Sequence, residues 1–211
     1  MPAPLATQTR VLQPGDTWVY DVNGSTVGVS PAVTGSGTIT ITVSSKPLNG
    51  ATVLAIDRTD HFVTSTGRTL DLVFTKYISQ NSANRDILEL GESSTGSSLQ
   101  TVAVPQTIIF GSWTNGATLN PTLDFGGGDV ETGPMQTITG SEVVQTPAGS
   151  FTAWKVTSPN SFSAGSNPIV FDWAPQLGAP VRYATFYGYS SPSGSADITA
   201  TATLKSTTVP H

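Results

Sequence analysis

The chain has 211 residues, of which only 11% are charged, and its formal net charge at pH 7 is −5. Its nine scattered Lys and Arg residues do not form the basic surface that follows a phosphate backbone, which argues against nucleic-acid binding. The absence of cysteine excludes disulfides, thiolate metal sites and thiol nucleophiles. No apolar run reaches the roughly 18 residues that would predict a transmembrane helix.

Alternation of apolar and polar residues with a period of two, typical of half-buried strands, recurs along the whole chain. Over 37–43, Ile39, Ile41 and Val43 are predicted to face inward and the intervening threonines outward. The 24 serine and 32 threonine residues suit such a pleated, hydroxyl-rich surface. Further strands are predicted over 18–22, 51–56, 69–78, 85–90, 101–110, 135–145, 169–173, 181–187 and 198–204.

Turn signals separate the strands at intervals typical of antiparallel hairpins. Pro105 predicts an edge strand or a break within its stretch. No sustained helical stripe is present, and a turn or two of helix near 82–90 competes with an equally good strand there. The turn signals are Asn23-Gly24, Asn49-Gly50, Asn115-Gly116, Pro147-Ala148-Gly149 and Ser193-Gly194.

The predicted fold is therefore all-β: an antiparallel meander forming a β-sandwich or an open, curved β-barrel, with little or no helix. A single domain is expected over residues 10–206, because no Pro-rich linker or charge run divides the chain. Flexible tails are expected over 1–9 and 207–211. A faint echo between Pro14–Trp18 and Phe110–Gly116 leaves open two related meanders, over about 10–100 and 101–206.

Three islands of sequence carry a family resemblance. They read PGDTWVY from Pro14, PAGSFTAWKV from Pro147 and DWAPQLGAPVRY from Asp172. Together they resemble exported bacterial proteins of unknown function, of the DUF3108-like and TapB-like kinds. The resemblance implies a periplasmic or secreted, lipoprotein-like all-β protein of the cell envelope, and it carries no catalytic residues and no cofactor.

The first ten residues, MPAPLATQTR, lack the apolar core of a signal peptide. They are interpreted as an initiator Met placed before a processed N-terminus, so a signal peptide or a lipid anchor is expected upstream in the full-length chain.

Four tryptophans are the candidate ligand-binding residues: Trp18, Trp113, Trp154 and Trp173. If two or more lay exposed on one face, they could stack on sugars, as in a carbohydrate-binding module. The preferred interpretation of Trp154 and Trp173 is structural, as a cross-strand aromatic pair worth about 0.5–1.5 kcal/mol beyond its buried area.

The candidate metal ligands are Asp124, Asp129 and Glu131, which flank the glycines at 126–128. Calcium binds six to eight oxygens on a flexible loop, and these glycines could turn backbone carbonyls inward. The spacing does not match an EF-hand, so a plain glycine-rich hairpin loop is preferred and no metal is predicted.

A hydrolase is a further alternative. His61 is the only internal histidine, and it lies beside Asp60 and near Asp57, so a Ser-His-Asp set is arithmetically available. The chain lacks the Gly-x-Ser-x-Gly elbow that would support it. Glycoside hydrolysis would need a pair of carboxylates at a set separation. The sequence alone does not identify such a pair among its 14 acidic residues.

The sequence favours a non-catalytic, envelope-associated protein with a binding or assembly role. Its partner is left open among a protein, a glycan and an apolar ligand. A partner strand could add to an exposed sheet edge, and an apolar ligand could lie on the concave face. We expect any binding site to lie on that face or in its loops rather than in the motif islands.

Overall fold

The computed structural model describes residues 5–26, 30–159, 168–191 and 194–211. All of its regular elements are strands, which confirms the predicted all-β class. The strands are β1 (Thr17–Thr26), β2 (Thr34–Leu48), β3 (Ala51–Thr64), β4 (Thr69–Gln80), β5 (Ile87–Ser94), β6 (Gln100–Ile109), β7 (Thr118–Leu119), β8 (Thr122–Gly126), β9 (Asp129–Thr132), β10 (Gln136–Thr146), β11 (Gly149–Ser158), β12 (Ile169–Ala174), β13 (Ala179–Ser191) and β14 (Gly194–Thr207).

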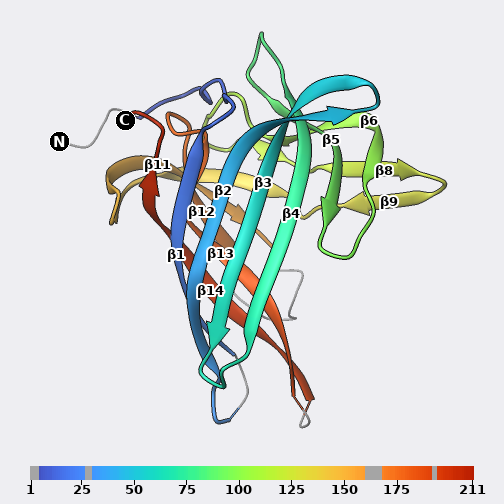
Figure 1. Cartoon of the computed structure of the whole chain (residues 1–211). Coiled ribbons are helices and arrows are strands. Elements are labelled where there is room, and N and C mark those ends of the chain that lie inside the picture. The colour runs from blue at the N-terminus through green and yellow to red at the C-terminus, as the bar shows by residue number, and fades with distance from the viewer. Residues whose placement is uncertain (1–4, 27–29, 160–167, 192–193) are drawn as a thin grey trace.

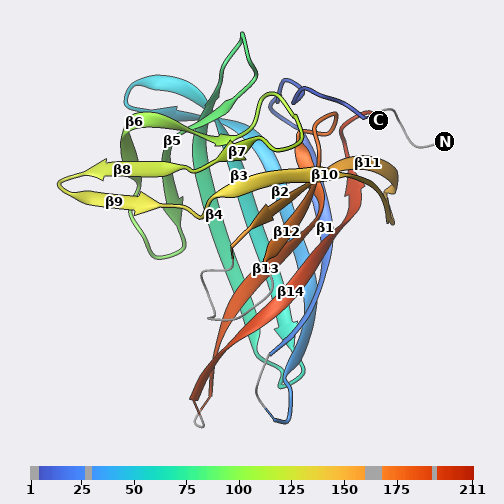
Figure 2. The same cartoon turned by 180° about the vertical axis from the view of Figure 1, so that it is seen from behind.

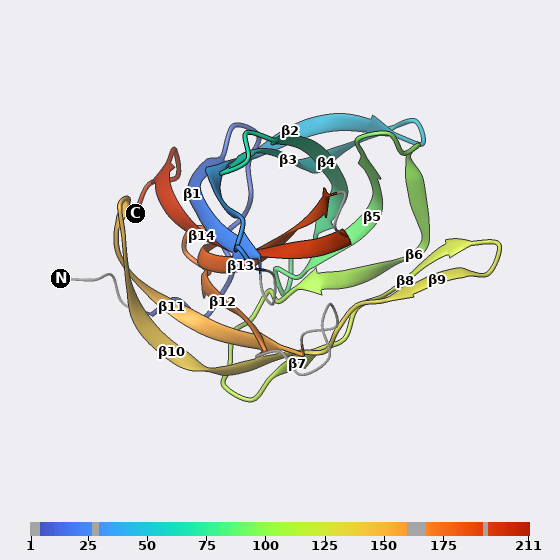
Figure 3. The same cartoon turned by 90° about the horizontal axis from the view of Figure 1, so that it is seen from below.

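Twelve strands form one antiparallel sheet in the order β6-β5-β4-β3-β2-β1-β14-β13-β12-β11-β10-β7. Most neighbours in the sheet are also neighbours in sequence, as expected for a meander, and β1 joins the two halves by pairing with both β2 and β14. The sheet curls into a nearly closed, barrel-like shape (Figure 3), in which β6 contacts β7 and β8. The β8–β9 hairpin forms its own small sheet and projects from the body (Figure 2).

The alternation predicted from the sequence sets which side chains fill the interior. Ile39 and Val43 on β2 are buried, as are Tyr20 and Val22 on β1. On β14, alternate residues from Ile198 to Leu204 are buried in the same way. Since successive side chains of a strand point to opposite faces, these residues line one continuous concave face, where most of the hydrophobic core lies.

Two of the predicted turns show why glycine is needed there. Asn49 and Gly50 both have positive φ, at 50° and 82°, and they join Leu48 to Ala51 in a tight β2–β3 hairpin. Such two-residue turns favour Asn-Gly because both central residues must adopt positive φ. The Pro147-Ala148 turn joins β10 to β11, with Thr146 opposite Gly149.

The predicted turn at Asn23-Gly24 is wrong. Both residues lie within β1 and pair with strands on either side. Gly24 is required by close strand approach instead: a Cβ there would lie 2.5 Å from the Cβ of Ala200. The predicted turn at Ser193-Gly194 and the polar loop over 160–167 lie wholly or partly outside the described residues.

Pro105 lies in β6, at one edge of the large sheet, as the sequence predicts. The register between β5 and β6 jumps from Gln106 to Thr101 on the β6 side, so Pro105 falls in the interval between the paired residues. A proline is tolerated there because no ladder hydrogen bond requires its missing N–H.

Both segments predicted as tails include residues that pack against the sheet. Thr9 is 1% exposed, and its hydroxyl donates to the Phe110 carbonyl at 2.6 Å and accepts from Trp113 Nε1 at 2.8 Å. At the other terminus, Val209 belongs to the main core. The domain therefore includes residues 5–9 and 207–211. Among the described residues, no helix has the length and apolar character needed to cross a membrane.

Candidate functional site

A cavity of about 410 Å³ lies within the curve of the large sheet. It opens between the main core and a smaller cluster built from Phe110, Trp113, Ile138, Trp154 and Val156. Its volume falls in the range of small-molecule sites, which are mostly apolar with a few placed polar groups. Apolar side chains dominate the lining, and they include Trp18, Ile41, Ile56, Ile108, Phe171 and Trp173.

Aromatic rings form one wall of the cavity. The rings of Trp113 and Trp173 stack with their centroids 5.6 Å apart and their planes 13° apart. Phe110 packs against Trp113 edge to face at 5.3 Å. Trp18 and Tyr183 also line the cavity, and Tyr183 meets Tyr20 in an edge-to-face contact at 5.2 Å. This wall brings together residues from β1, β12, β13 and the segment after β6.

Arg58 on β3 lines the cavity, and it forms an ion pair with Asp60, which is not itself part of the lining. Arg58 and Asp60 are two residues apart, so both side chains point inward. Arg58 Nε and Nη2 donate to the two carboxylate oxygens of Asp60 at 2.7 and 2.5 Å. Asp60 is fully buried, and it also accepts a hydrogen bond from the Tyr187 hydroxyl at 3.2 Å. Nη2 of Arg58 reaches Thr185 on β13 at 3.0 Å, so the pair bridges two distant strands of the sheet.

The protonation states of this group follow from its surroundings. Burial would lower the pKa of Arg58, but hydrogen bonding and attraction to Asp60 raise it above its usual range, so the guanidinium stays charged. Burial raises the pKa of the Tyr183 and Tyr187 hydroxyls, with a further contribution from the charge of Asp60. Both tyrosines are therefore neutral hydrogen-bond donors at physiological pH.

A second charged group adjoins the first on β4 and β5. Lys76 Nζ donates to both carboxylate oxygens of Glu89, each at 2.9 Å, and to Glu92 at 2.6 Å. Glu89 is fully buried behind Lys76. Burial raises the pKa of Glu89 to about 7, against the opposing pull of the Lys76 charge. The Glu89 carboxyl is therefore partly protonated near neutral pH.

A smaller pocket of about 280 Å³ adjoins the cavity. Ile41, Ile56, Arg58 and Lys76 line both spaces. The ring of Phe74, which also lines the smaller pocket, lies 5.6 Å from the guanidinium carbon of Arg58. Arg58 and Lys76 thus occupy the boundary between the two spaces.

The four candidate tryptophans do not form an exposed platform. Trp18, Trp113 and Trp154 are buried, and only Trp173 is partly exposed. Trp154 and Trp173 lie opposite each other in the β11–β12 register, although the ring that stacks on Trp173 is that of Trp113. The structure instead places Trp18, Trp113 and Trp173 around one cavity.

The three candidate metal ligands lie on the exposed β8–β9 hairpin. Asp124 is opposite Val130 and Glu131 is opposite Leu123, so their side chains project to opposite faces of the hairpin. Asp124 Oδ1 accepts a hydrogen bond from the Gly126 N–H at 2.8 Å, which stabilises the turn. No group of three potential metal-ligating side chains occurs in the part of the chain that the structure describes.

His61 lies on the outer side of the sheet, apart from the cavity. Its Nδ1 is 2.7 Å from Asp71 Oδ1, and both side chains are more than half exposed. The two aspartates near it in sequence have other partners: Asp60 binds Arg58 inside, and Asp57 binds Lys46 outside. His61 therefore does not assemble with either of them.

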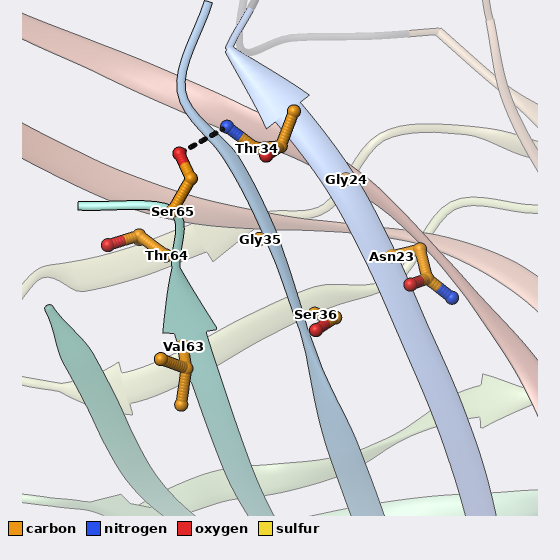
Figure 4. Close-up of a pocket in the computed structure, with 8 residues that line it drawn as sticks. All are labelled: Asn23, Gly24, Thr34, Gly35, Ser36, Val63, Thr64 and Ser65. Atoms are coloured by element: carbon orange, nitrogen blue, oxygen red, sulfur yellow. Dashed lines mark hydrogen bonds between the residues drawn. The ribbon is translucent and has the colours of Figure 1, made fainter. Parts of the chain in front are cut away.

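A shallow hollow of about 480 Å³ lies at the ends of β1, β2 and β3 (Figure 4). Ser65 Oγ accepts a hydrogen bond from the Thr34 N–H at 3.2 Å across it. Its described lining consists of small hydroxyl residues, glycines, Asn23 and Val63, and none of these side chains is ionisable. The interior cavity, which combines aromatic rings with charged groups, is the stronger candidate site.

The sequence did not point to the charged residues at and beside this cavity. Arg58, Lys76, Glu89 and Glu92 were not among the candidates, and Asp60 was considered only as a partner of His61. A usable signal was present for Arg58 and Asp60. In the β3 segment, Arg58 and Asp60 share a face with Ile56 and Phe62, so period-two alternation places two charges on the buried side. Because charged residues are rarely buried unless they are paired, charges on the buried side of a predicted strand indicate a candidate ion pair or binding site.

No family model, curated protein or solved structure matches this chain.

Proposed function

We propose that this protein binds a small, largely apolar molecule in the cavity enclosed by its curved sheet. The observation that supports this most is the cavity itself: a space of about 410 Å³, lined by aromatic and aliphatic side chains. That volume lies within the roughly 300–1,000 Å³ of sites that hold drug-sized ligands. Burial of apolar surface at roughly 25 cal/mol per Å² would drive binding.

The proposed role is binding without a chemical step, at the bacterial cell envelope. The envelope location rests on the resemblance of the three motif islands to exported proteins. Fractionation of cells that express the full-length chain tests it: recovery with the cytoplasmic fraction would contradict this part of the proposal.

The binding proposal is tested with an uncharged fluorescent dye, N-phenyl-1-naphthylamine. Saturable binding is expected, with quenching of tryptophan fluorescence because Trp18, Trp113 and Trp173 line the cavity. Organic extraction of the purified protein followed by mass spectrometry would then identify any molecule it carries. Absence of saturable dye binding would contradict the proposal.

A cavity-filling variant locates the bound dye. Ile41 lines both the cavity and the adjoining pocket, so Ile41→Phe should weaken dye binding at least tenfold. The matched control is Thr40→Phe, since the preceding residue of β2 points to the outer face. Equal dye affinity in the two variants would place the dye elsewhere and contradict the proposed site.

A further inference from the structure

The charges around the cavity are already balanced by one another. Two cations, Arg58 and Lys76, are held by three carboxylates, Asp60, Glu89 and Glu92. Both oxygens of Asp60 accept from Arg58, and both oxygens of Glu89 accept from Lys76. Neither cation carries an uncompensated charge that could attract an anionic ligand.

Hydrogen-bond donors, in contrast, remain without partners. Arg58 donates through Nε and Nη2 to Asp60 and Thr185, and its Nη1 makes no hydrogen bond within the part of the chain that the structure describes. Two other lining residues carry buried donors without a partner in that part of the chain: Trp18 through Nε1 and Tyr183 through its hydroxyl. Those two atoms have almost no accessible surface, whereas Arg58 Nη1 is not among the buried atoms that lack a partner. Arg58 Nη1 is therefore the donor that a ligand oxygen in the cavity can reach.

We propose that the cavity selects neutral molecules that carry a hydrogen-bond acceptor oxygen, such as an ester, a ketone or an amide, and discriminates against carboxylates. This inference rests on the proposed binding function and names its ligand class. A neutral oxygen can accept from Arg58 Nη1 while the Arg58–Asp60 pair stays intact. A carboxylate would lose its hydration without gaining a free cation, and it would lie close to the buried charge of Asp60.

The test compares two ligands of one chain length, methyl decanoate and decanoate, as competitors of bound N-phenyl-1-naphthylamine at pH 7.5. The ester is expected to bind at least tenfold more tightly than the carboxylate. Equal or tighter binding of decanoate would overturn the inference while leaving the binding function in place. If the dye itself does not bind, the proposed function fails, and this inference fails with it.

A charge-removal variant reports on the cause of the selectivity. Asp60→Asn keeps the side-chain shape but leaves Arg58 positively charged without its carboxylate, so decanoate affinity should rise at least tenfold relative to the ester. The control is Asp57→Asn, on the same strand but on the outer face, where Asp57 pairs with Lys46. An unchanged ester-to-acid ratio in Asp60→Asn would contradict the assignment. The ratio in the unmodified protein decides the inference even if this variant is unstable.

Infrared spectroscopy tests whether the ligand oxygen accepts a hydrogen bond. The measured quantity is the carbonyl stretching band of bound methyl decanoate labelled with carbon-13 at the carbonyl. A hydrogen-bonded carbonyl absorbs at lower wavenumber than the same ester in hexane, and such a shift is expected. A bound band at the hexane position would show that the oxygen has no donor and would overturn this part of the inference.

Discussion

The ring of Phe62 on β3 stacks on the ring of Tyr187 on β13, with the centroids 4.4 Å apart and the planes 19° apart. In the sheet these strands are separated by β2, β1 and β14, so the contact crosses the concave side. Tyr187 then reaches Asp60 through its hydroxyl. The stack therefore links the hydrophobic core to the Arg58–Asp60 pair and stabilises the curvature of the sheet.

Gly35 should be intolerant of any side chain because of this stack. A Cβ at this position would lie 2.3 Å from Phe62 Cε1, so Gly35→Ala is expected to destabilise the protein by about 1–3 kcal/mol through overpacking. Gly188→Ala is the control, since a Cβ there meets nothing within 4 Å. Urea unfolding of both variants measures the difference, and equal stabilities would contradict the packing described.

The Arg58–Asp60 pair should behave as a unit in a double-mutant cycle. Arg58→Met leaves the buried Asp60 carboxylate unpaired and should cost about 3–5 kcal/mol of unfolding free energy. Adding Asp60→Leu should recover most of that loss, because buried pairs replaced by apolar residues are often neutral in stability. Urea unfolding at pH 7 tests this, and simple additivity of the two changes would argue against a coupled pair.

Glu89 should make the protein less stable as pH rises. Its pKa is about 7 in the folded protein against an ordinary value of 4.5, so between these values the folded state binds more protons than the unfolded state. The free energy of unfolding should therefore fall with rising pH in this window, by up to about 3 kcal/mol.

Glu89→Gln removes this titration. Its stability relative to wild type should improve from pH 4.5 to pH 8, as measured by urea unfolding at several pH values. Glu131→Gln on the exposed β8–β9 hairpin serves as the control. Parallel pH profiles of wild type and Glu89→Gln would refute the assigned role.

Thr9 should contribute to stability although it lies in a segment predicted to be a tail. Thr9→Val removes the hydroxyl that accepts from Trp113 Nε1 and donates to the Phe110 carbonyl, leaving two buried groups unpaired at about 1–3 kcal/mol each. Thr7→Val, at an exposed position, is the matched control. Thermal unfolding compares the two, and a similar melting temperature for both would mean that the segment does not contribute as described.

The sequence predicted the strands well where side-chain alternation is clean. Ile39 and Val43 are buried and Ile41 is partly buried on the expected face, and the inward residues from Ile198 to Leu204 are buried on theirs. Prediction failed at Asn23-Gly24, where a common turn pair lies inside a strand. A glycine needed for a turn and one needed for close strand approach look alike in sequence, and only the neighbour, here Ala200, distinguishes them.

The candidate site was predicted only in outline. Any binding site was expected on the concave face or in its loops, and three of the four candidate tryptophans line the cavity on that face. The charged residues of the site were not predicted, because pairing between Lys76 and Glu89, or between Arg58 and Thr185, depends on register and on the bulges between strands.

The sequence by itself determined that this protein is an antiparallel all-β meander, because alternation, turn residues and β-branched side chains act locally along the chain. Only the tertiary structure decided that the sheet curls far enough to enclose a cavity, and which rings and charges face it. Those features depend on contacts between residues far apart in sequence, such as Phe62 with Tyr187 and Trp113 with Trp173. Alternation along a strand predicts which face each side chain points to. It does not predict which residue of a distant strand the side chain will contact.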